Sequence, residues 1–379
     1  MSERRASLDR HQKVMKTPIV SLITPVFNGA RTIVESLQSV ICQEEKDWEL
    51  ILVDDGSTDG TAECARSSDD TRIRYFRQDH KGRSTARNQG LAQARGKCLL
   101  FLDADDWLLP NALADHLDFF EKHPEFDVSV SDGYFCSDDG AQLATFSKRR
   151  GPVQSGDVLE QIVVHAGLIG GSMCAMVRRD VTQAHGISFE SGLEFGEDWL
   201  FWITLARFAR FGFNPKVTCK YRWHAGNTTL GATEDFRKDQ IWRGRKIVMD
   251  SDYFPTLSLH VRERFFHQLL IQVLARRDEE REKVITSRQF TALPTHVRAR
   301  LLRLVASEYI LAGENPTAVD KYLRSASELR PLDPKQILLR LLSLASPRAA
   351  RAAVNSWRKL HMTKESDPLF GAPEGAAVS

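Results

Sequence analysis

The sequence KCLLFLDADDW, residues 97–107, starts as an apolar run and ends in three carboxylates within four positions. A short, continuous apolar run is typical of a strand that is buried on both faces. Residues that follow such a strand lie at the carboxyl edge of a parallel sheet, where ligands bind. Crowded carboxylates repel one another, and a hard divalent cation would relieve that repulsion. An isolated Asp-x-Asp is more often a solvated turn that caps the next helix, so the rest of the chain must decide.

A second apolar run, ELILV at residues 49–53, also ends in carboxylates, Asp54 and Asp55. Two acidic strand ends at one sheet edge favour a binding site over a helix cap. The first 115 residues alternate strand and helix four times, which is typical of a parallel α/β sheet. The expected strands are 19–24, stopped by Pro25, then 49–53, 73–77 and 98–102, and the expected helices include 31–44 and 81–94.

The pattern loosens after residue 116. We expect strands at 126–130 and 173–177, a polar loop at 135–157, and an amphipathic helix at 199–210 that follows an acidic pair. Residues 236–379 are expected to be almost all helix. The sequence therefore predicts a disordered arm at 1–17, an α/β domain at 18–235, a helical C-terminal extension at 236–368 and a disordered tail at 369–379.

Charge divides the chain unevenly. Residues 241–379 carry 23 basic and 15 acidic side chains, and the preceding residues carry 29 and 35. The acidic part suits a metal site, and the basic part could face an anionic surface or be a set of solvated helices. The N-terminus has no apolar segment typical of a secretory signal, and no stretch of about 18 apolar residues predicts a membrane-spanning helix. The cytoplasm is the default location.

Several motifs are absent from the sequence. The six cysteines include no C-x-x-C pair, which argues against a zinc site. No G-x-G-x-x-G follows a strand, so a Rossmann dinucleotide site is not supported. G-x-S-x-G and H-E-x-x-H are also missing, which removes the nucleophile elbow and the zincin helix.

Four segments in order, residues 21–28, 53–61, 86–90 and 101–106, resemble family 2 glycosyltransferases with the GT-A fold. The resemblance is strong over about 18–115 and implies a Rossmann-like, mostly parallel central sheet flanked by helices. It also implies an inverting, metal-dependent enzyme of class EC 2.4, a hexosyl- or N-acetylhexosaminyltransferase. Such an enzyme would move a sugar from a UDP-sugar to a hydroxyl of a glycan or lipid-linked acceptor in cell-surface polysaccharide synthesis.

The resemblance assigns roles in binding the nucleotide. Pro25 and Phe27 would flank the base, and Phe27 replaces a commoner Tyr while keeping the ring. Asp55 would accept a hydrogen bond from the uracil imide, with Asp54 supporting it. Arg83 would reach the diphosphate, and a solvated cation is the alternative for it.

The family's Asp-x-Asp falls on residues of the opening stretch. Asp103 would hold the ribose and contribute to the metal site, and Asp105 would hold the divalent ion, Mn²⁺ or Mg²⁺. Asp106 would assist or replace either one. His224 resembles a late His that completes metal or diphosphate contacts, although a lone His beside aromatic residues is as often structural.

The acidic pair Glu197–Asp198 matches the position of the family's catalytic base. Asp198 is assigned as the general base that takes the proton of the acceptor hydroxyl, and Glu197 is the fallback. A single displacement would invert the anomeric centre. Capping of the following helix is the alternative role for Asp198.

Two other functions remain open on the sequence alone. A nucleotidyltransferase would share the sheet and the metal-bound carboxylates but needs a basic, Gly-rich triphosphate loop, which residues 25–29 do not provide. A non-catalytic sugar-nucleotide-binding or scaffold protein is the second alternative. The expected partners are the UDP-sugar and the acceptor, and not nucleic acid. A basic face of the tail would give peripheral contact with an anionic membrane, with the protein cytoplasmic at the inner face of the plasma membrane. Its residues would be Arg340, Arg348, Arg351, Arg358 and Lys359.

Overall fold

The computed structural model describes residues 17–150, 153–224, 226–227, 231–275, 277–313 and 315–361. The terminal segments predicted to be disordered lie outside these ranges, apart from residue 17. The described chain forms two compact units: residues 17–162 and 167–227 make the first, and 163–166 and 231–361 make the second. The domain boundary predicted at 235 stays a prediction, while the structural division falls at 231.

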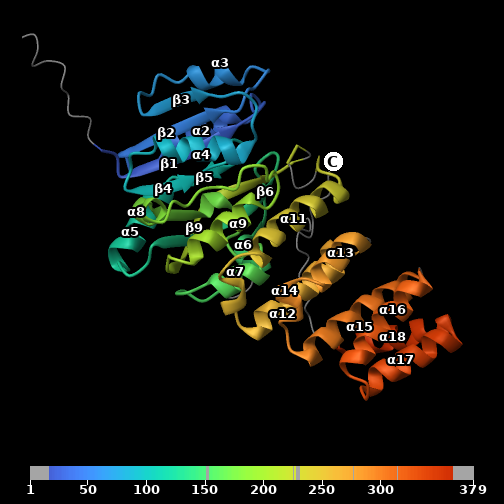
Figure 1. Cartoon of the computed structure of the whole chain (residues 1–379). Helices are drawn as coiled ribbons and strands as arrows, with labels where there is room; N and C mark the ends of the chain where they lie inside the picture. Colours follow the sequence, from blue (N-terminus) through green and yellow to red (C-terminus); the bar gives the residue numbers. More distant parts are fainter. Residues whose placement is uncertain are drawn as a thin grey trace, which may run out of the picture. The chain divides into compact units, whose positions relative to one another are not determined.

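The first unit is built on a nine-stranded sheet in the order β3-β2-β1-β4-β8-β6-β9-β5, with β7 paired to β6 (Figure 1). β1, β2, β3 and β4 are parallel, and β8 is antiparallel to both β4 and β6. β9 pairs in parallel with β6, so most strands share one direction. The strands are β1 (Val20–Val26), β2 (Trp48–Asp54), β3 (Ile73–Arg77), β4 (Cys98–Phe101), β5 (Trp107–Leu108), β6 (Val128–Ser137), β7 (Gln142–Thr145), β8 (Ala175–Arg178) and β9 (Phe211–Trp223).

The sheet is held by a mainly apolar interior. β1, β2 and β4 are buried along their whole length, as their continuous apolar runs predict. The helices of this unit are α2 (Ile33–Ile41), α3 (Thr61–Arg66), α4 (Arg83–Gln93), α5 (Ala112–Lys122), α6 (Phe146–Arg150), α7 (Leu159–Val164, continuing into the second unit), α8 (Arg179–Ala184) and α9 (Glu197–Ala206).

Gly90 sets the position of α4 against the sheet. A Cβ at Gly90 would lie 2.3 Å from Ile23 Cγ2 of β1, so no larger residue fits between the helix and the strand. Arg87 lies one helical turn earlier, and residues three apart share a helix face. The close approach at Gly90 therefore brings the buried Arg87 to the sheet's carboxyl edge.

Three expectations for local structure were wrong. β1 continues through Pro25, although proline has no N–H to donate. The pairing of β1 with β4 ends at Ile23, so no hydrogen bond to β4 is lost at Pro25. The expected loop at 135–157 contains the end of β6, β7 and α6. β9 was not predicted at all, because Gly212, Pro215 and Lys216 break its apolar alternation.

The second unit is helical, as expected for the C-terminal extension. Among its described residues, no helix is long and apolar enough to cross a membrane. Its helices are α11 (Glu234–Met249), α12 (Leu259–Gln268), α13 (Asp278–Ile285), α14 (Arg288–Thr291), α15 (Thr295–Ala312), α16 (Pro316–Leu329), α17 (Pro334–Ala345) and α18 (Pro347–His361), with a short 3₁₀ turn at Phe254–Thr256 and a π-helical turn at Leu269–Val273.

Candidate active site

A cavity of about 1020 Å³ opens at the carboxyl edge of β1, β2 and β4. Its size suits a ligand larger than a simple sugar. The residues predicted for the site that line it are Pro25, Phe27, Asp55, Arg83, Asp103, Asp105 and His224. Asp54, Asp106, Glu197 and Asp198 do not contribute to this lining as far as the structure describes it.

Asp54 holds the turn that follows β2. Its carboxylate accepts hydrogen bonds from the Ser57 N–H at 2.7 Å and from the Tyr75 hydroxyl at 2.5 Å. Burial alone would raise the pKa of Asp54, but these hydrogen bonds outweigh burial and lower it. Asp54 is therefore a buried, ionised support for this turn, and the supporting role in nucleotide binding that the family resemblance implies stays a prediction.

Asp55 is buried and fastens the loop 78–82. Oδ1 accepts from Gln78 Nε2 at 2.6 Å and from the Lys81 N–H at 2.8 Å. Oδ2 accepts from the Gly82 N–H at 2.9 Å and lies 2.9 Å from His80 Nδ1. Gly82 has φ +88°, a conformation that favours glycine. A uracil imide would have to replace one of these donors in order to reach Asp55.

Phe27 and His80 cover the same end of the cavity. Their rings are stacked, with centroids 4.0 Å apart and an interplanar angle of 24°. The Phe27 ring is 46% exposed, so an apolar face is already available there. A planar base could stack on this ring, because aromatic side chains present large apolar faces of suitable shape.

Arg87 joins the two acidic segments that the sequence analysis treated separately. Its guanidinium donates to Asp103 Oδ1 at 2.6 Å and to Glu197 Oε1 at 2.8 Å. Burial would lower the pKa of Arg87, but the two carboxylates raise it by more than burial lowers it, so the net pKa is raised. Arg87 in turn lowers the pKa of Asp103 against the effect of burial. Arg83 lies on the same side, 3.8 Å from Glu197.

Arg87 lies within the segment 86–90 that resembles the family, but no role was predicted for it from the sequence. The available signal was a cation on the sheet-facing side of α4, three residues before a glycine that packs on β1. No pattern in the sequence, however, reveals that its partners lie at residues 103 and 197.

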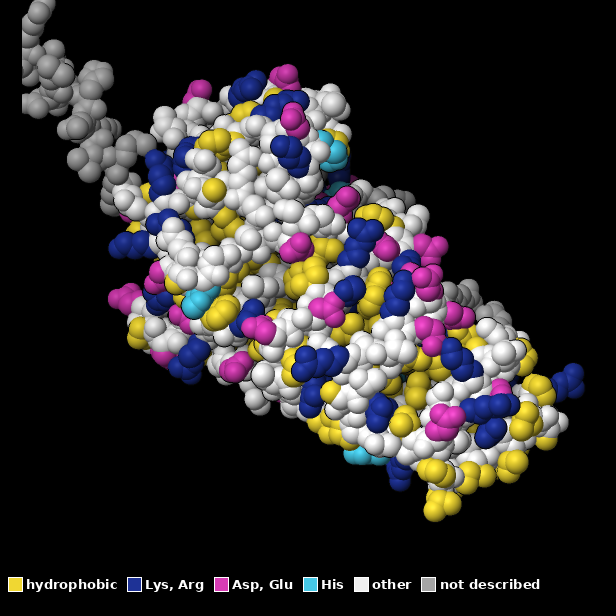
Figure 2. All heavy atoms as spheres, viewed as in Figure 1, with side chains coloured by type: hydrophobic (Ala, Val, Ile, Leu, Met, Phe, Trp, Pro, Cys, Tyr) yellow, Lys and Arg dark blue, Asp and Glu magenta, His cyan; other side chains and the backbone are white. Residues whose placement is uncertain are grey.

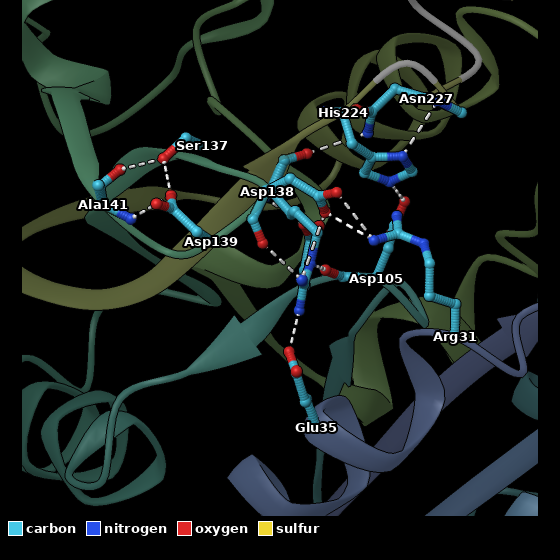
Figure 3. A network of polar contacts seen from close by, with 12 residues as sticks. Arg31, Glu35, Asp105, Ser137, Asp138, Asp139, Ala141, His224 and Asn227 are labelled. Carbon is cyan, nitrogen blue, oxygen red and sulfur yellow. Dashed lines mark hydrogen bonds and ion pairs between the residues drawn. The ribbon is translucent and has the colours of Figure 1, made fainter. Parts of the chain in front are cut away.

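Asp105 faces the cavity beside His224, as Figure 3 shows. His224 Nε2 lies 3.0 Å from Asp105 Oδ2. His224 Nδ1 accepts from the Gly226 N–H at 3.1 Å, which places the proton of the neutral ring on Nε2, directed at Asp105. The Asn227 amide oxygen accepts from the His224 N–H at 2.6 Å. In this arrangement, His224 orients the Asp105 carboxylate.

Asp106 points away from the cavity and is buried. Its Oδ1 accepts from the Arg222 N–H at 2.9 Å, and within the described chain its Oδ2 has no hydrogen-bond partner. Burial, followed by the charges of Asp105 and Asp103, raises the pKa of Asp106 well above the usual value for a carboxyl group. A neutral Asp106 fits the structure better than a charged metal ligand does.

Arg222 of β9 braces the acidic loop from behind. Its guanidinium donates to the Asp105 carbonyl and to the Asp138 carbonyl, both at 2.9 Å, and also pairs with Glu35. It lies 3.8 Å from the centroid of the Trp107 ring. In Figure 3, Asp138 lies between this cluster and Arg31, which donates to it at 2.7 Å and 2.9 Å. Arg31 and Asp138 both line the cavity, and neither was predicted.

Asp198 lies in the first turn of α9, after Gly196 in a left-handed conformation. Its Oδ1 accepts from the Trp199 N–H at 2.7 Å, but Gly196 is the N-cap of α9 and no described side chain forms a cap hydrogen bond there, so the capping role considered from the sequence does not occur. Burial, and then the charge of Glu197, raise the pKa of Asp198 to about 6. A carboxyl group with such a pKa can accept a proton near neutral pH. The helix contact therefore does not exclude a role as a base.

The residues present fit a divalent ion that is completed by substrate. Within the described residues, no group of three or more His, Cys, Asp or Glu side chains is arranged to hold a metal by itself. Asp105 supplies a cavity-facing carboxylate, and Asp103 a second one that is already paired with Arg87. Mg²⁺ commonly binds through one or two carboxylates and the phosphates of a substrate. The donor set matches that arrangement.

Removal of Arg87 should destabilise the first unit strongly. We expect Arg87→Met to lower the free energy of unfolding by about 3–5 kcal/mol, because Glu197 and part of Asp103 would stay buried without their cation. Urea denaturation at pH 7.5 measures this. Arg31→Met removes a cation from an exposed pair and should cost no more than about 1 kcal/mol. Equal, small losses in both variants would contradict the assigned role of Arg87.

Comparisons with known proteins identify the relatives of this chain. The family described as "Glycosyl transferase family 2" matches residues 21–186. A putative teichuronic acid biosynthesis glycosyltransferase, TuaG, of Bacillus subtilis is 30% identical over 232 residues, which are 59% of this chain and 86% of that protein. An uncharacterized glycosyltransferase of Rickettsia typhi is 29% identical over 231 residues, 60% of this chain and 71% of that protein. Two more, from Rickettsia conorii and Rickettsia felis, are matched over only 35% of their own length.

The crystal structure of S. aureus TarS residues 1–349 in complex with UDP-GlcNAc superimposes with a TM-score of 0.55 at 19% identity, covering 90% of this chain and 91% of that one. The fold is therefore that of a GT-A glycosyltransferase. The chain belongs to glycosyltransferase family 2.

Proposed function

We propose that the chain is an inverting, metal-dependent glycosyltransferase that moves a hexosyl or N-acetylhexosaminyl group from a UDP-sugar to a hydroxyl of a glycan or lipid-linked acceptor. The observation that carries this proposal is the Arg87 bridge, which connects Asp103 at the cavity with the Glu197–Asp198 pair. It holds a donor-side carboxylate and the residue next to the candidate base in one rigid network. The relation to a teichuronic acid enzyme favours a surface polysaccharide as the product.

On the donor side, Pro25 and Phe27 would flank the uracil, and Asp55 would accept from its imide after giving up one of its loop donors. Asp103 would bind the ribose, and Arg83 would approach the diphosphate. A divalent ion held by Asp105 would supply Lewis-acid stabilisation of the leaving UDP. His224 would keep the Asp105 carboxylate oriented through its Nε2–H.

On the acceptor side, Asp198 would take the proton of the attacking hydroxyl, and Glu197 would be fixed by Arg87. In-line attack by that hydroxyl on the anomeric carbon would break the bond to the UDP oxygen and invert the configuration. We place this reaction in the cytoplasm, where nucleotide sugars and lipid-linked acceptors meet at the inner face of the membrane. Family membership disfavours the nucleotidyltransferase, and turnover measurements test the non-catalytic alternative.

A thermal-shift screen with Mn²⁺ tests the donor assignment. A ligand at 100 times its Kd stabilises the folded state by about 2.7 kcal/mol, so UDP-sugars should raise the Tm by several degrees. ADP-sugars should shift it less, because adenine has no ring N–H that could donate to Asp55. Phe27→Ala, at an exposed residue, should weaken the UDP-sugar shift while leaving the Tm of the free protein unchanged. Equal shifts for UDP- and ADP-sugars, or none, would count against the proposal.

A further inference from the structure

Helix α17 exposes a continuous apolar face. Leu341 is 61% exposed and Leu344 is 69% exposed, and Leu332, just before the helix, is 89% exposed. Ile337 and Leu338 are 43% and 47% exposed. The four residues in α17 share one helical face, because Leu338, Leu341 and Leu344 follow Ile337 by one, four and seven positions. The opposite face packs against α16 and α18 through Gln336 and Leu339.

The exposed apolar residues lie along one edge of the C-terminal helices. In Figure 2, hydrophobic side chains gather on the part of the surface where Figure 1 places α17. Most soluble proteins scatter their exposed apolar residues singly, and a contiguous set of large ones indicates an interaction surface. We call this set, Leu332 with Ile337, Leu338, Leu341 and Leu344, the α17 face.

The charges on α17 and α18 themselves are of one sign, and Asp333, the N-cap of α17, is paired with Arg303. Residues 334–361, which form α17 and α18, contain six Lys and Arg and no Asp or Glu. Two of the six are paired with carboxylates of neighbouring helices: Arg340 with Asp320 at 3.7 Å, and Arg358 with Glu308. The remaining cations are Lys335, Arg348, Arg351 and Lys359, and all four belong to exposed residues. Arg340 and Arg358, two of the five basic residues expected to face a membrane, are therefore already neutralised by ion pairs within the chain.

We propose that the α17 face inserts at the surface of an anionic lipid bilayer. An apolar helix face flanked by basic residues is the composition of helices that lie in the membrane interface. Anionic headgroups complement the uncompensated cations, and the Leu side chains reach the acyl boundary. A second copy of the chain is the weaker occupant, because it would bring a like-charged surface against this one. The proposal does not depend on the reaction described above.

Vesicle co-sedimentation of the full-length chain tests this proposal. The protein should pellet with vesicles of phosphatidylglycerol and phosphatidylethanolamine and stay in solution with phosphatidylcholine. Leu341→Glu combined with Leu344→Glu should lower partitioning roughly tenfold or more, because it removes buried apolar area and adds repulsion. Arg348→Gln with Lys359→Gln should weaken partitioning into anionic vesicles about fivefold per cation and make that partitioning less dependent on salt concentration.

A matched control has the same number of apolar-to-acidic changes elsewhere. Val34 and Ile247 are 50% and 41% exposed, so Val34→Glu with Ile247→Glu should pellet like the unaltered chain. Circular dichroism checks that all variants fold. The proposal is overturned if the unaltered chain ignores anionic vesicles, or if the Leu341 and Leu344 changes have no effect. It is also overturned if the Leu341 and Leu344 changes convert a dimer into a monomer, or if binding to anionic vesicles requires removal of residues 362–379.

Discussion

Replacing Asp198 with Asn should lower the rate of sugar transfer by roughly 10²–10⁴-fold, because an amide cannot accept the proton of the acceptor hydroxyl. Binding of the UDP-sugar should change little, since Asp198 does not contribute to the described lining of the cavity. The measurement is UDP release at saturating donor, with the donor Kd determined separately. A loss in kcat with an unchanged Kd would assign Asp198 to the chemical step.

The pH dependence provides a second readout for the same residue. Because the pKa of Asp198 is raised to about 6, the unaltered enzyme should lose activity as the pH falls through 6 and the carboxyl group becomes protonated. A folded-state pKa above the unfolded value means that Asp198 costs stability as the pH rises from about 4 to above 6. Asp198→Asn should therefore lose the acidic limb of the rate profile and, at pH 8, unfold at a higher temperature than the unaltered chain.

Asp180 offers a matched control for this prediction. It also lies in the first turn of a helix, and its Oδ1 accepts from the next N–H at 2.8 Å, but its side chain is exposed and remote from the cavity. Asp180→Asn should leave kcat unchanged. If the two variants lose activity equally, or if Asp198→Asn transfers sugar at the normal rate, Asp198 has only a structural role in the first turn of α9. The base must then be a different residue.

Replacing Asp105 with Ala should reduce turnover by roughly 10³-fold or more, because it removes the cavity-facing carboxylate proposed to hold the divalent ion. The variant should also lose the dependence of UDP affinity on Mn²⁺, which calorimetric titration with and without the metal measures. This second readout separates loss of metal binding from general damage. His224 would lose its acceptor at the same time, so the loop after β4 loses one tie to β9 but keeps Arg222.

Two variants sharpen the assignment of Asp105. Asp118→Asn removes an exposed carboxylate on α5 and should have no effect on turnover. Asp106→Asn should cost less than Asp105→Ala, because the raised pKa of Asp106 already keeps that group largely neutral. Full turnover by Asp105→Ala, or unchanged turnover of the native chain in excess chelator, would refute the role proposed for this residue.

Most of the parallel half of the sheet could be predicted from sequence because β1, β2 and β4 are buried on both faces. The runs before Asp54 and Asp103 are apolar without interruption, and both proved to be fully buried strands whose carboxylates reach one edge. β9 escaped prediction because its long, bent path contains glycine, proline and lysine and is stabilised by pairing with β6. Tertiary pairing, not local preference, forms that strand.

The carboxylates at strand ends and Arg83 could be proposed for the site from the sequence, but Arg87, Arg222 and Asp138 could not. Asp55, Asp103 and Asp105 follow strands, and strand ends can be recognised locally. Arg87 and Arg222 act through partners that are 16 to 187 residues away in the sequence, and such contacts exist only after folding. The structure also separated Asp105, which faces the cavity, from Asp106, which is buried behind it; the sequence left this choice open.

In the mechanism proposed for this chain, the cavity binds a UDP-sugar and a single displacement releases UDP. The most direct test is proton NMR of the slow hydrolysis of the UDP-α-sugar that gives the largest thermal shift, with water as the acceptor. We predict UDP together with a free sugar that is first formed as the β-anomer, before mutarotation, and no such product with Asp198→Asn. First formation of the α-anomer, or no UDP from any donor of the screen, would contradict the account.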